Sequence, residues 1–215
     1  MPFSREEFFA IFAAWNTAAW PYWLLAYPAG LIMLVLCLRG TGRAPRVVLA
    51  LLGVMWIVCG AGYQWAYFAQ INPAARGFAL GFVLEGALLI AFAITTDVRI
   101  SARCDLRTAL ALVIMVYGLV LYPLVGWAFG HSYPEMPIFG IAPCPTVIFT
   151  LGALMLMSGR GVGCLLVVPF LWGGVGGSAA LLLGVPQDYG LIAATVIAAA
   201  LMLSRSFGRR SADHA

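Results

Sequence analysis

Lysine is absent from this 215-residue chain, so all twelve of its basic residues are arginine. The missing lysine excludes chemistry that needs a Schiff base, including that of a retinal pigment. Charged residues are scarce as well, at 9% of the chain against about 25% in soluble domains, whereas 63% of the residues are hydrophobic. These values exclude a cytosolic enzyme, a nucleic-acid-binding module, a disordered chain and a disulfide-stapled secreted domain. The composition predicts a protein whose main partner is the lipid bilayer and which binds no nucleic acid.

Histidine and cysteine, the usual ligands of metals and haem, are also few. The two histidines, His131 and His214, lie outside every predicted membrane span, which excludes a haem held between span histidines. Of the five cysteines only Cys144 falls on the predicted outer side, so we expect no structural disulfide. No CxxC, HExxH or paired-histidine spacing is present. We therefore expect no cofactor.

Seven stretches are apolar enough to be membrane spans, for which about 20 residues are needed. They are residues 18–38, 47–69, 74–95, 108–129, 145–157, 162–183 and 189–203. The fifth is short, and the connecting loops leave no room for a second domain. We therefore predict an all-α fold in which residues 1–215 form one transmembrane domain, a bundle of seven helices.

The first residues predict a further, shorter helix. Ser4 and Glu7 have the spacing of a capping box, and the phenylalanines at positions 8, 9 and 12 would share one face. Glu6 and Glu7 stand where an export signal carries basic residues. We expect an amphipathic helix that lies in the membrane interface before the first span.

The arginines predict the orientation. With seven spans, ten of them share one side of the membrane and only Arg5 and Arg76 fall on the other. Positive residues gather on the cytoplasmic side, so the N-terminus is predicted outside and the C-terminus in the cytoplasm. If the fifth stretch did not cross, the three arginines of the C-terminal tail would move outside and the bias would disappear.

Glu85 is the one acidic residue inside a predicted span. A charge near mid-depth is costly and usually faces the bundle interior or a polar cavity. Gly77, Gly81 and Glu85 follow a four-residue spacing, so they share a helix face that we expect to pack against a neighbouring helix. Glu85 could bind a proton or cation, or it could be a protonated acid bonded to another helix.

The outer loop before the fifth span is rich in proline and contains His131. Because this span is short, Cys144 is predicted to lie below the outer surface, with the loop folded over it. Cys144 and Thr146 would then stand at a helix N-terminus. Three roles for Cys144 remain open: a soft-metal ligand together with His131, a nucleophile with His131 as its base, or a small buried apolar residue.

The sixth span carries Pro169 and four glycines between positions 173 and 177. This pattern could mark a hinge, but it favours a tight helix crossing through Gly173 and Gly177.

Three segments resemble a bacterial family of integral membrane proteins that is labelled only as a domain of unknown function. They are Tyr63-Gln64-Trp65 with Phe68 and Asn72-Pro73-Ala74-Ala75, the His131-Ser132-Tyr133-Pro134 loop with residues 144–150, and Gly184-Val185-Pro186-Gln187-Asp188. The resemblance extends over most of the chain and implies a bacterial inner-membrane protein. It implies no activity, cofactor or catalytic residue.

These observations lead to one main functional hypothesis, in which polar residues of the outer half line a pocket that binds or transports a small solute or ion. The residues are Asn72, Glu85, Tyr122, His131, Cys144, Thr146, Gln187 and Asp188. One alternative is a non-catalytic subunit or assembly factor, in a homo-oligomer or a larger membrane complex. Another is a membrane-embedded enzyme that uses the Cys144 thiol, although an enzyme is the less favoured class.

Overall fold

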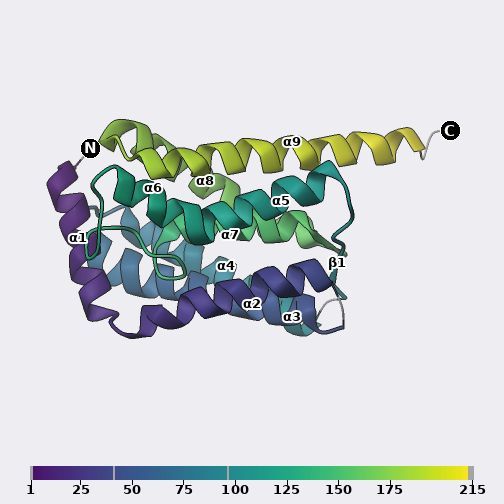
Figure 1. The fold of residues 1–215 in the computed structure, drawn as a ribbon, viewed down its shortest axis with the longest axis horizontal. Helices are drawn as coiled ribbons and strands as arrows, with labels where there is room; N and C mark the ends of the chain where they lie inside the picture. Colours follow the sequence, from purple (N-terminus) through teal and green to yellow (C-terminus); the bar gives the residue numbers. More distant parts are fainter. Residues whose placement is uncertain (1, 41, 96, 213–215) are drawn as a thin grey trace.

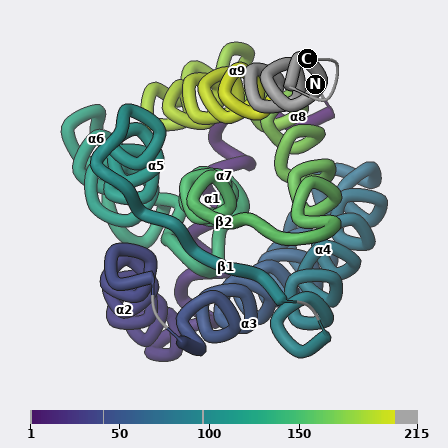
Figure 2. Tube along the Cα trace, turned by 90° about the vertical axis from the view of Figure 1, so that its right-hand side faces the viewer, coloured from purple at the N-terminus to yellow at the C-terminus, as the bar shows by residue number. Residues whose placement is uncertain are grey.

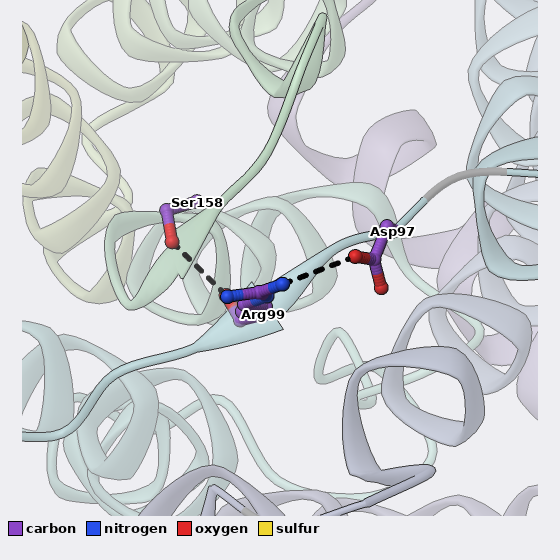
Figure 3. A network of polar contacts seen from close by, with 3 residues as sticks. All are labelled: Asp97, Arg99 and Ser158. Atoms are coloured by element: carbon purple, nitrogen blue, oxygen red, sulfur yellow. Dashed lines mark hydrogen bonds and ion pairs between the residues drawn. The ribbon is translucent and has the colours of Figure 1, made fainter.

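The computed structural model describes residues 2–40, 42–95 and 97–212, with side chains up to residue 202. Helices dominate these residues, which confirms the predicted all-α class. The exception is a pair of two-residue antiparallel strands, β1 (Arg99–Ile100) and β2 (Met157–Ser158). Next to them Arg99 pairs with Asp97 at 3.3 Å, and the Ser158 hydroxyl donates to the Arg99 carbonyl (Figure 3).

Most helices run along one common direction, and α1 lies across one end of them (Figure 1). The elements in chain order are α1 (Arg5–Ala18), η1 (Tyr22–Leu25), α2 (Ala26–Arg39), α3 (Ala44–Ile57), η2 (Val58–Tyr67), η3 (Phe68–Gln70), α4 (Ala75–Thr95), α5 (Leu106–Val116), η4 (Tyr117–Leu121), α6 (Tyr122–Ala128), α7 (Pro143–Met155), η5 (Val162–Leu166), α8 (Val167–Leu183), η6 (Pro186–Asp188) and α9 (Tyr189–Ala212). The elements η2 and η4 are π-helical turns that continue α3 and α5 without a break.

Five helical segments are long and apolar enough to cross a membrane. They are Tyr22–Arg39, Ala44–Gln70, Ala75–Thr95, Leu106–Ala128 and Val162–Leu183. Two shorter apolar helices, Pro143–Met155 and Pro186–Met202, lie in the same bundle. The chain is thus confirmed as a multi-pass membrane protein. Five segments can cross by their length and composition, and a count of seven requires both shorter helices to cross as well.

The short helix α7 occupies the centre of the bundle. Viewed along the bundle, it is surrounded by α2, α3, α4, α5, α8 and α9 (Figure 2). All thirteen residues of α7 are buried. The preceding segment, residues 137–142, is non-helical and also buried, so it continues the central column above the helix. This matches the prediction of a short helix with its loop folded over it, because protein rather than lipid covers the non-helical backbone.

Side-chain hydroxyls tie this central column to itself and to α3. The Thr146 hydroxyl donates to the Ala142 carbonyl at 2.7 Å and accepts from the Gly140 N–H at 3.0 Å. One turn further on, the Trp56 indole N–H donates to the Thr150 hydroxyl at 2.9 Å. Hydrogen bonds of this kind are needed because nothing else around α7 can satisfy buried polar groups.

The close packing of α4 against a neighbouring helix does not involve the glycines that were expected to form it. At Gly77 an added Cβ would meet open space, and at Gly81 only Val168 of α8 lies within reach. Instead, α3 and α4 approach at Gly53 and Gly86, where an added Cβ would stand 2.7 and 2.6 Å from the carbonyl oxygen of the opposite glycine. The prediction of a Gly77–Gly81 packing face was therefore wrong. Sequence spacing gives a face of a helix but not the neighbour that it meets.

The glycines of α8, in contrast, form the predicted tight crossing. Gly173, Gly176 and Gly177 are buried and face α9, where added Cβ atoms at Gly176 and Gly177 would stand 2.8 Å from Leu191 and 2.9 Å from Ile192. Pro169 lies in the first turn of α8, where its missing N–H breaks no helical hydrogen bond. The helix is continuous, so close packing and not a hinge explains this sequence.

The two ends of the bundle differ in character. One end, here called the α1 end, is covered by α1, whose capping box between Ser4 and Glu7 is present as predicted. The other, the arginine end, carries β1, β2 and the loops around residues 39–46, 97–107 and 156–162, and α9 extends beyond it (Figure 1). The polar groups that were expected to form a site lie mainly at the α1 end.

Candidate binding cavity at the α1 end

A cavity of about 150 Å³ lies beneath α1. Its walls come from the N-terminal segment, α1, η2, η3, the start of α4, the start of α7, α8 and η6. The lining residues are Pro2, Phe3, Phe8, Phe12, Tyr63, Phe68, Asn72, Phe78, Pro143, Cys144, Trp172, Val175, Gly176, Ser178, Ala179 and Asp188. Three of the predicted site residues, Asn72, Cys144 and Asp188, are thus brought to one cavity from distant parts of the chain.

Asp188 is the only residue with a carboxyl group in that wall, and it is 3% exposed. It accepts a hydrogen bond of 2.5 Å from the Tyr122 hydroxyl, and the Cys144 thiol lies beside the same carboxyl group. Asp188 forms no ion pair with any residue whose side chain the structure describes. Arg76, which also belongs to the α1 end, lies over the Trp65 ring instead. The carboxyl group is therefore held in place by neutral donors only.

The π-helical turn η2 places Tyr63 in the cavity wall. Such turns insert an extra residue into a helix and often occur at functional sites. Tyr63 stacks between Phe12 and Phe68, with ring centroids 4.6 and 5.6 Å away. Its hydroxyl is buried and has no hydrogen-bond partner among the described residues, as is the case for both amide atoms of the neighbouring Gln64. Two polar side chains of η2 thus have unused hydrogen-bonding capacity.

Trp172 forms the opposite part of the wall. It contacts Phe78 edge-on, with ring centroids 5.5 Å apart. Its indole N–H lies beside the Cys144 sulfur and has no oxygen or nitrogen acceptor among the described residues. A buried indole N–H normally finds such an acceptor. Two aromatic residues of the wall, Tyr63 and Trp172, thus carry covered donors without an oxygen or nitrogen acceptor among the described residues.

His131 and Gln187 form a second polar group beside the cavity. The Nδ1 atom of His131 lies 3.2 Å from the Gln187 side-chain oxygen, and its Nε2 lies 3.1 Å from the Arg5 guanidinium. Because the guanidinium can only donate, Nε2 accepts and Nδ1 carries the proton in a neutral ring. The main-chain carbonyl of Gln187 accepts from the Tyr117 hydroxyl at 2.8 Å. Phe9 of α1 packs against the imidazole, with the ring centroids 4.3 Å apart. This network joins α1 to η6, which also carries Asp188.

Two predicted site residues have other surroundings. The hydroxyl of Thr146 is fully used inside the central column, and Thr146 does not line the cavity. Glu85 lies halfway along α4, is fully buried and is absent from the cavity wall. Neither of its carboxyl oxygens has a hydrogen-bond partner in the part of the chain that the structure describes. The eight residues thus form a cavity with an adjacent network, together with two separate positions.

The geometry bears on the two chemical roles considered for Cys144. Its neighbours are Asp188 and Trp172, whereas the described partners of His131 are Arg5, Gln187 and Phe9. A Cys–His pair of the kind that activates a thiol is thus not formed here. In the described residues, no three side chains of histidine, cysteine, aspartate or glutamate are grouped as metal ligands. Cys144 is best described as part of the cavity wall.

Sequence reasoning missed most of the aromatic wall. Tyr63 is 2% exposed and belongs to the interior, but it was not among the predicted site residues. The phenylalanines of α1 were expected to face lipid, but Phe8, Phe9 and Phe12 are buried against the bundle. The polar dipeptide Tyr63-Gln64 inside an otherwise apolar span was the available signal for Tyr63. No comparable signal marks Phe68, Phe78 or Trp172.

The fold and the cavity define a multi-pass α-helical membrane protein with a pocket at one end. Residues 5–213 match the model of a family of unknown function, DUF6064, and the chain belongs to this family. A comparison of the chain with curated proteins and with solved structures found no match. The resemblance to a family of unknown function, inferred from the sequence, is thereby confirmed.

Proposed function

We propose that this protein is a seven-span membrane protein that binds a small solute in the cavity beneath α1. One observation carries the proposal: Asp188, a buried carboxyl group without a cationic partner among the described side chains, lies in the wall of a cavity together with Tyr63, whose covered hydroxyl has no hydrogen-bond partner there. Buried polar groups are normally satisfied, so each exception requires an explanation. A bound solute that supplies the missing partners is the explanation favoured here.

Seven crossings and an outward-facing α1 end are part of the proposal. The two short helices lie in the same bundle as the five long ones, and α7 has protein on all sides, so it needs no lipid-facing length of its own. Most of the arginines whose side chains the structure describes lie at the arginine end. With seven crossings this end would face the cytoplasm, as the positive-inside rule requires. The membrane would be the bacterial inner membrane, and the cavity would open away from the cytoplasm.

Transport of the solute would require a path from the cavity towards the arginine end. Glu85, halfway along α4 and beyond the cavity, is the residue that we propose for a proton or cation in such a cycle. Intramembrane carboxyl groups commonly have this role. Binding in the cavity is the first step of either a receptor or a carrier, and it can be tested separately.

Solute binding can be measured through Cys144, because this thiol lines the cavity. The protein would be placed in lipid nanodiscs with exposed Cys104 and Cys164 changed to serine. A membrane-permeant maleimide would then be applied with a panel of cationic, anionic and neutral small solutes. We expect at least one solute to slow alkylation of Cys144 by tenfold or more.

Two variants decide whether such protection arises in the cavity. Ala179→Phe places a ring in the cavity wall and should abolish protection, whereas Ala87→Phe adds the same ring on an exposed face of α4 and should not. If no solute of the panel protects Cys144, the proposal is wrong. A role as subunit or assembly factor would then be favoured, and identification of proteins that copurify from the native membrane would be the next step.

A further inference from the structure

We infer that the solute of this cavity is a small quaternary ammonium compound that also carries an oxygen acceptor. This inference rests on the proposed function and specifies its ligand. Three properties of the cavity point to it: aromatic rings form much of its wall, its one carboxyl group lacks a cation, and the hydroxyl of Tyr63 in the wall has no hydrogen-bond partner among the described residues.

Seven of the sixteen lining residues are aromatic: Phe3, Phe8, Phe12, Tyr63, Phe68, Phe78 and Trp172. Ring contacts connect them in a chain, with Phe12, Tyr63 and Phe68 stacked in sequence and Phe3 and Phe8 packed against Phe68. Phe78 and Trp172 form the facing pair. Aromatic faces attract cations, and cages of such rings are the usual binding sites of quaternary ammonium groups. A purely apolar ligand would be contained equally well by aliphatic residues.

Asp188 distinguishes a cationic ligand from a neutral one. A buried carboxylate without a positive partner is strongly destabilising. The donors that reach Asp188, the Tyr122 hydroxyl and the Cys144 thiol, are neutral, and Arg76 is engaged with Trp65. A cation in the cavity would supply the missing charge, and an anion would be repelled. Because a quaternary ammonium group donates no hydrogen bonds, it can lie against both the carboxylate and the rings.

The unpartnered donors and the size of the cavity specify the rest of the ligand. The Tyr63 hydroxyl is unpartnered and covered by its neighbours, so a small shift of the rings around it would let it donate to an oxygen on the ligand. Apolar cavities of about 150 Å³ hold molecules as small as benzene. Choline, which joins a trimethylammonium group to a hydroxyl through two carbons, has this size and both functions. It serves as the probe for the class.

The test compares three probes on the protein in nanodiscs by isothermal titration calorimetry. Choline carries both functions, tetramethylammonium lacks the oxygen, and dimethylbutanol is the neutral isostere of choline with carbon in place of nitrogen. We expect choline to bind at least tenfold more tightly than dimethylbutanol. Asp188→Asn should reduce choline affinity at least tenfold while it retains an oxygen that can accept from Tyr122. Asp97→Asn, at the arginine end, is the matched control and should change nothing.

Tyr63→Phe tests the oxygen acceptor. It retains the stacked ring and removes a hydroxyl that has no partner in the described structure, so the fold should not suffer. Affinity for choline should fall about tenfold and affinity for tetramethylammonium should stay within twofold. An equal loss for both probes, or for neither, would contradict the assignment of the oxygen to Tyr63.

The outcomes separate this inference from the proposed function. If dimethylbutanol binds as tightly as choline, or if only an anionic or neutral solute protects Cys144, the cavity binds a solute but not this class. If no solute of the panel protects Cys144, the proposed function is wrong as well. Tight choline binding that is lost in Asp188→Asn and retained in Asp97→Asn would support both.

Discussion

At the scale of single residues, buried polar groups without partners distinguish the helices around the cavity and the middle of α4 from the fully bonded central column. Tyr63, Gln64 and Trp172 belong to helices that border the cavity, whereas Glu85 is isolated halfway along α4. In contrast, Thr146, Thr150 and Trp56 are fully bonded in the central column. Unsatisfied groups cost free energy, and they remain in proteins mainly where a ligand or a proton uses them.

The isolation of Glu85 leads to a prediction about its role. Glu85→Gln removes the ionisable group and keeps the size of the side chain. Because Glu85 does not line the cavity, solute affinity should stay within twofold of the wild type. If Glu85 carries a proton or cation in a transport cycle, uptake into proteoliposomes should fall at least tenfold in this variant. The two readouts are titration calorimetry and radiolabelled uptake.

Glu6→Gln, an exposed change on α1, is the control for this experiment. Unchanged uptake in Glu85→Gln would show that the carboxyl group has no part in transport. A large loss of affinity would show instead that Glu85 communicates with the cavity.

At the scale of secondary-structure elements, α1 is the cover of the cavity. Besides its phenylalanines, three polar contacts hold it: Arg5 bonds to His131, the Trp15 indole donates to the Ile141 carbonyl, and Asn16 donates to the carbonyls of Pro134 and Met136. All three reach the segment between α6 and α7. A solute that enters the cavity from the α1 end therefore has to pass this helix or move it.

Arg5→Ala should loosen this cover. The variant loses one charge-assisted hydrogen bond at a largely exposed position, worth about 1 kcal/mol. This corresponds to an increase of about fivefold in the population of the open state. Amide hydrogen exchange in α1 and alkylation of Cys144 should both accelerate by about that factor. Rates like those of the wild type would show that the phenylalanines alone hold α1 in place.

A second prediction at this scale concerns the start of α5. Asp105 caps that helix, and its carboxylate accepts from the Thr108 N–H at 2.8 Å. This bond and a further one from the Thr108 side chain lower the pKa of Asp105 below its usual value. The contribution of Asp105 to stability is therefore complete above the pKa of the unfolded chain, about 3.9, and is lost as the pH falls through the lower folded pKa.

The measurement is the unfolding midpoint of the protein in nanodiscs as the pH falls from about 6 through and below the unfolded pKa of about 3.9. Asp105→Asn keeps a capping oxygen but does not titrate, so its midpoint should depend less on pH than that of the wild type in this range. Asp97→Asn, in the neighbouring loop, serves as control. Identical pH profiles for Asp105→Asn and the wild type would exclude a contribution of this cap.

The elements themselves could largely be predicted from the sequence. Hydrophobic runs predicted α4 and the apolar segment Val162–Leu183 almost to the residue, and the Ser4–Glu7 capping box predicted the start of α1. These features are local, because lipid solvation and capping depend on residues close together in the chain. The contacts between helices are not local, which explains why the Gly53–Gly86 approach was missed and the Gly77–Gly81 face was wrong.

At the scale of the whole molecule, the number of crossings decides which end of the protein meets the solute. With seven crossings, Ser132 in the segment before α7 and Cys164 after it lie on opposite sides of the membrane. We expect an impermeant maleimide to label a Ser132→Cys variant in intact cells and to label Cys164 only after lysis. Native Cys104, in the loop before α5, should behave like Cys164.

The same reagent on denatured protein controls for the reactivity of each thiol. Labelling of positions 132 and 164 from the same side would mean that α7 does not cross. The count would then fall below seven, and the proposed orientation would lose its support from the arginines.

The candidate site could be predicted only in part, because it is assembled from the whole molecule. Polar residues near the predicted outer helix ends were expected to form a site, and three of them, Asn72, Cys144 and Asp188, do meet in one cavity. The aromatic wall could not be predicted, since Phe8, Phe68 and Trp172 look like ordinary lipid-facing residues until the helices are placed. Glu85 drew attention because a charge is rare in a span, yet rarity alone does not give its distance from other groups.

The central position of α7 has a consequence for the biogenesis of this protein. The ribosome delivers α7 before α8 and α9, so at that moment only part of its surrounding ring exists. A helix of thirteen residues is too short to be stable alone in the lipid phase. It has to wait beside the translocon, or against α3 and α5, until the last two helices emerge and enclose it. Truncation after α7 should therefore leave a chain that is degraded rapidly, whereas one that retains α9 should accumulate.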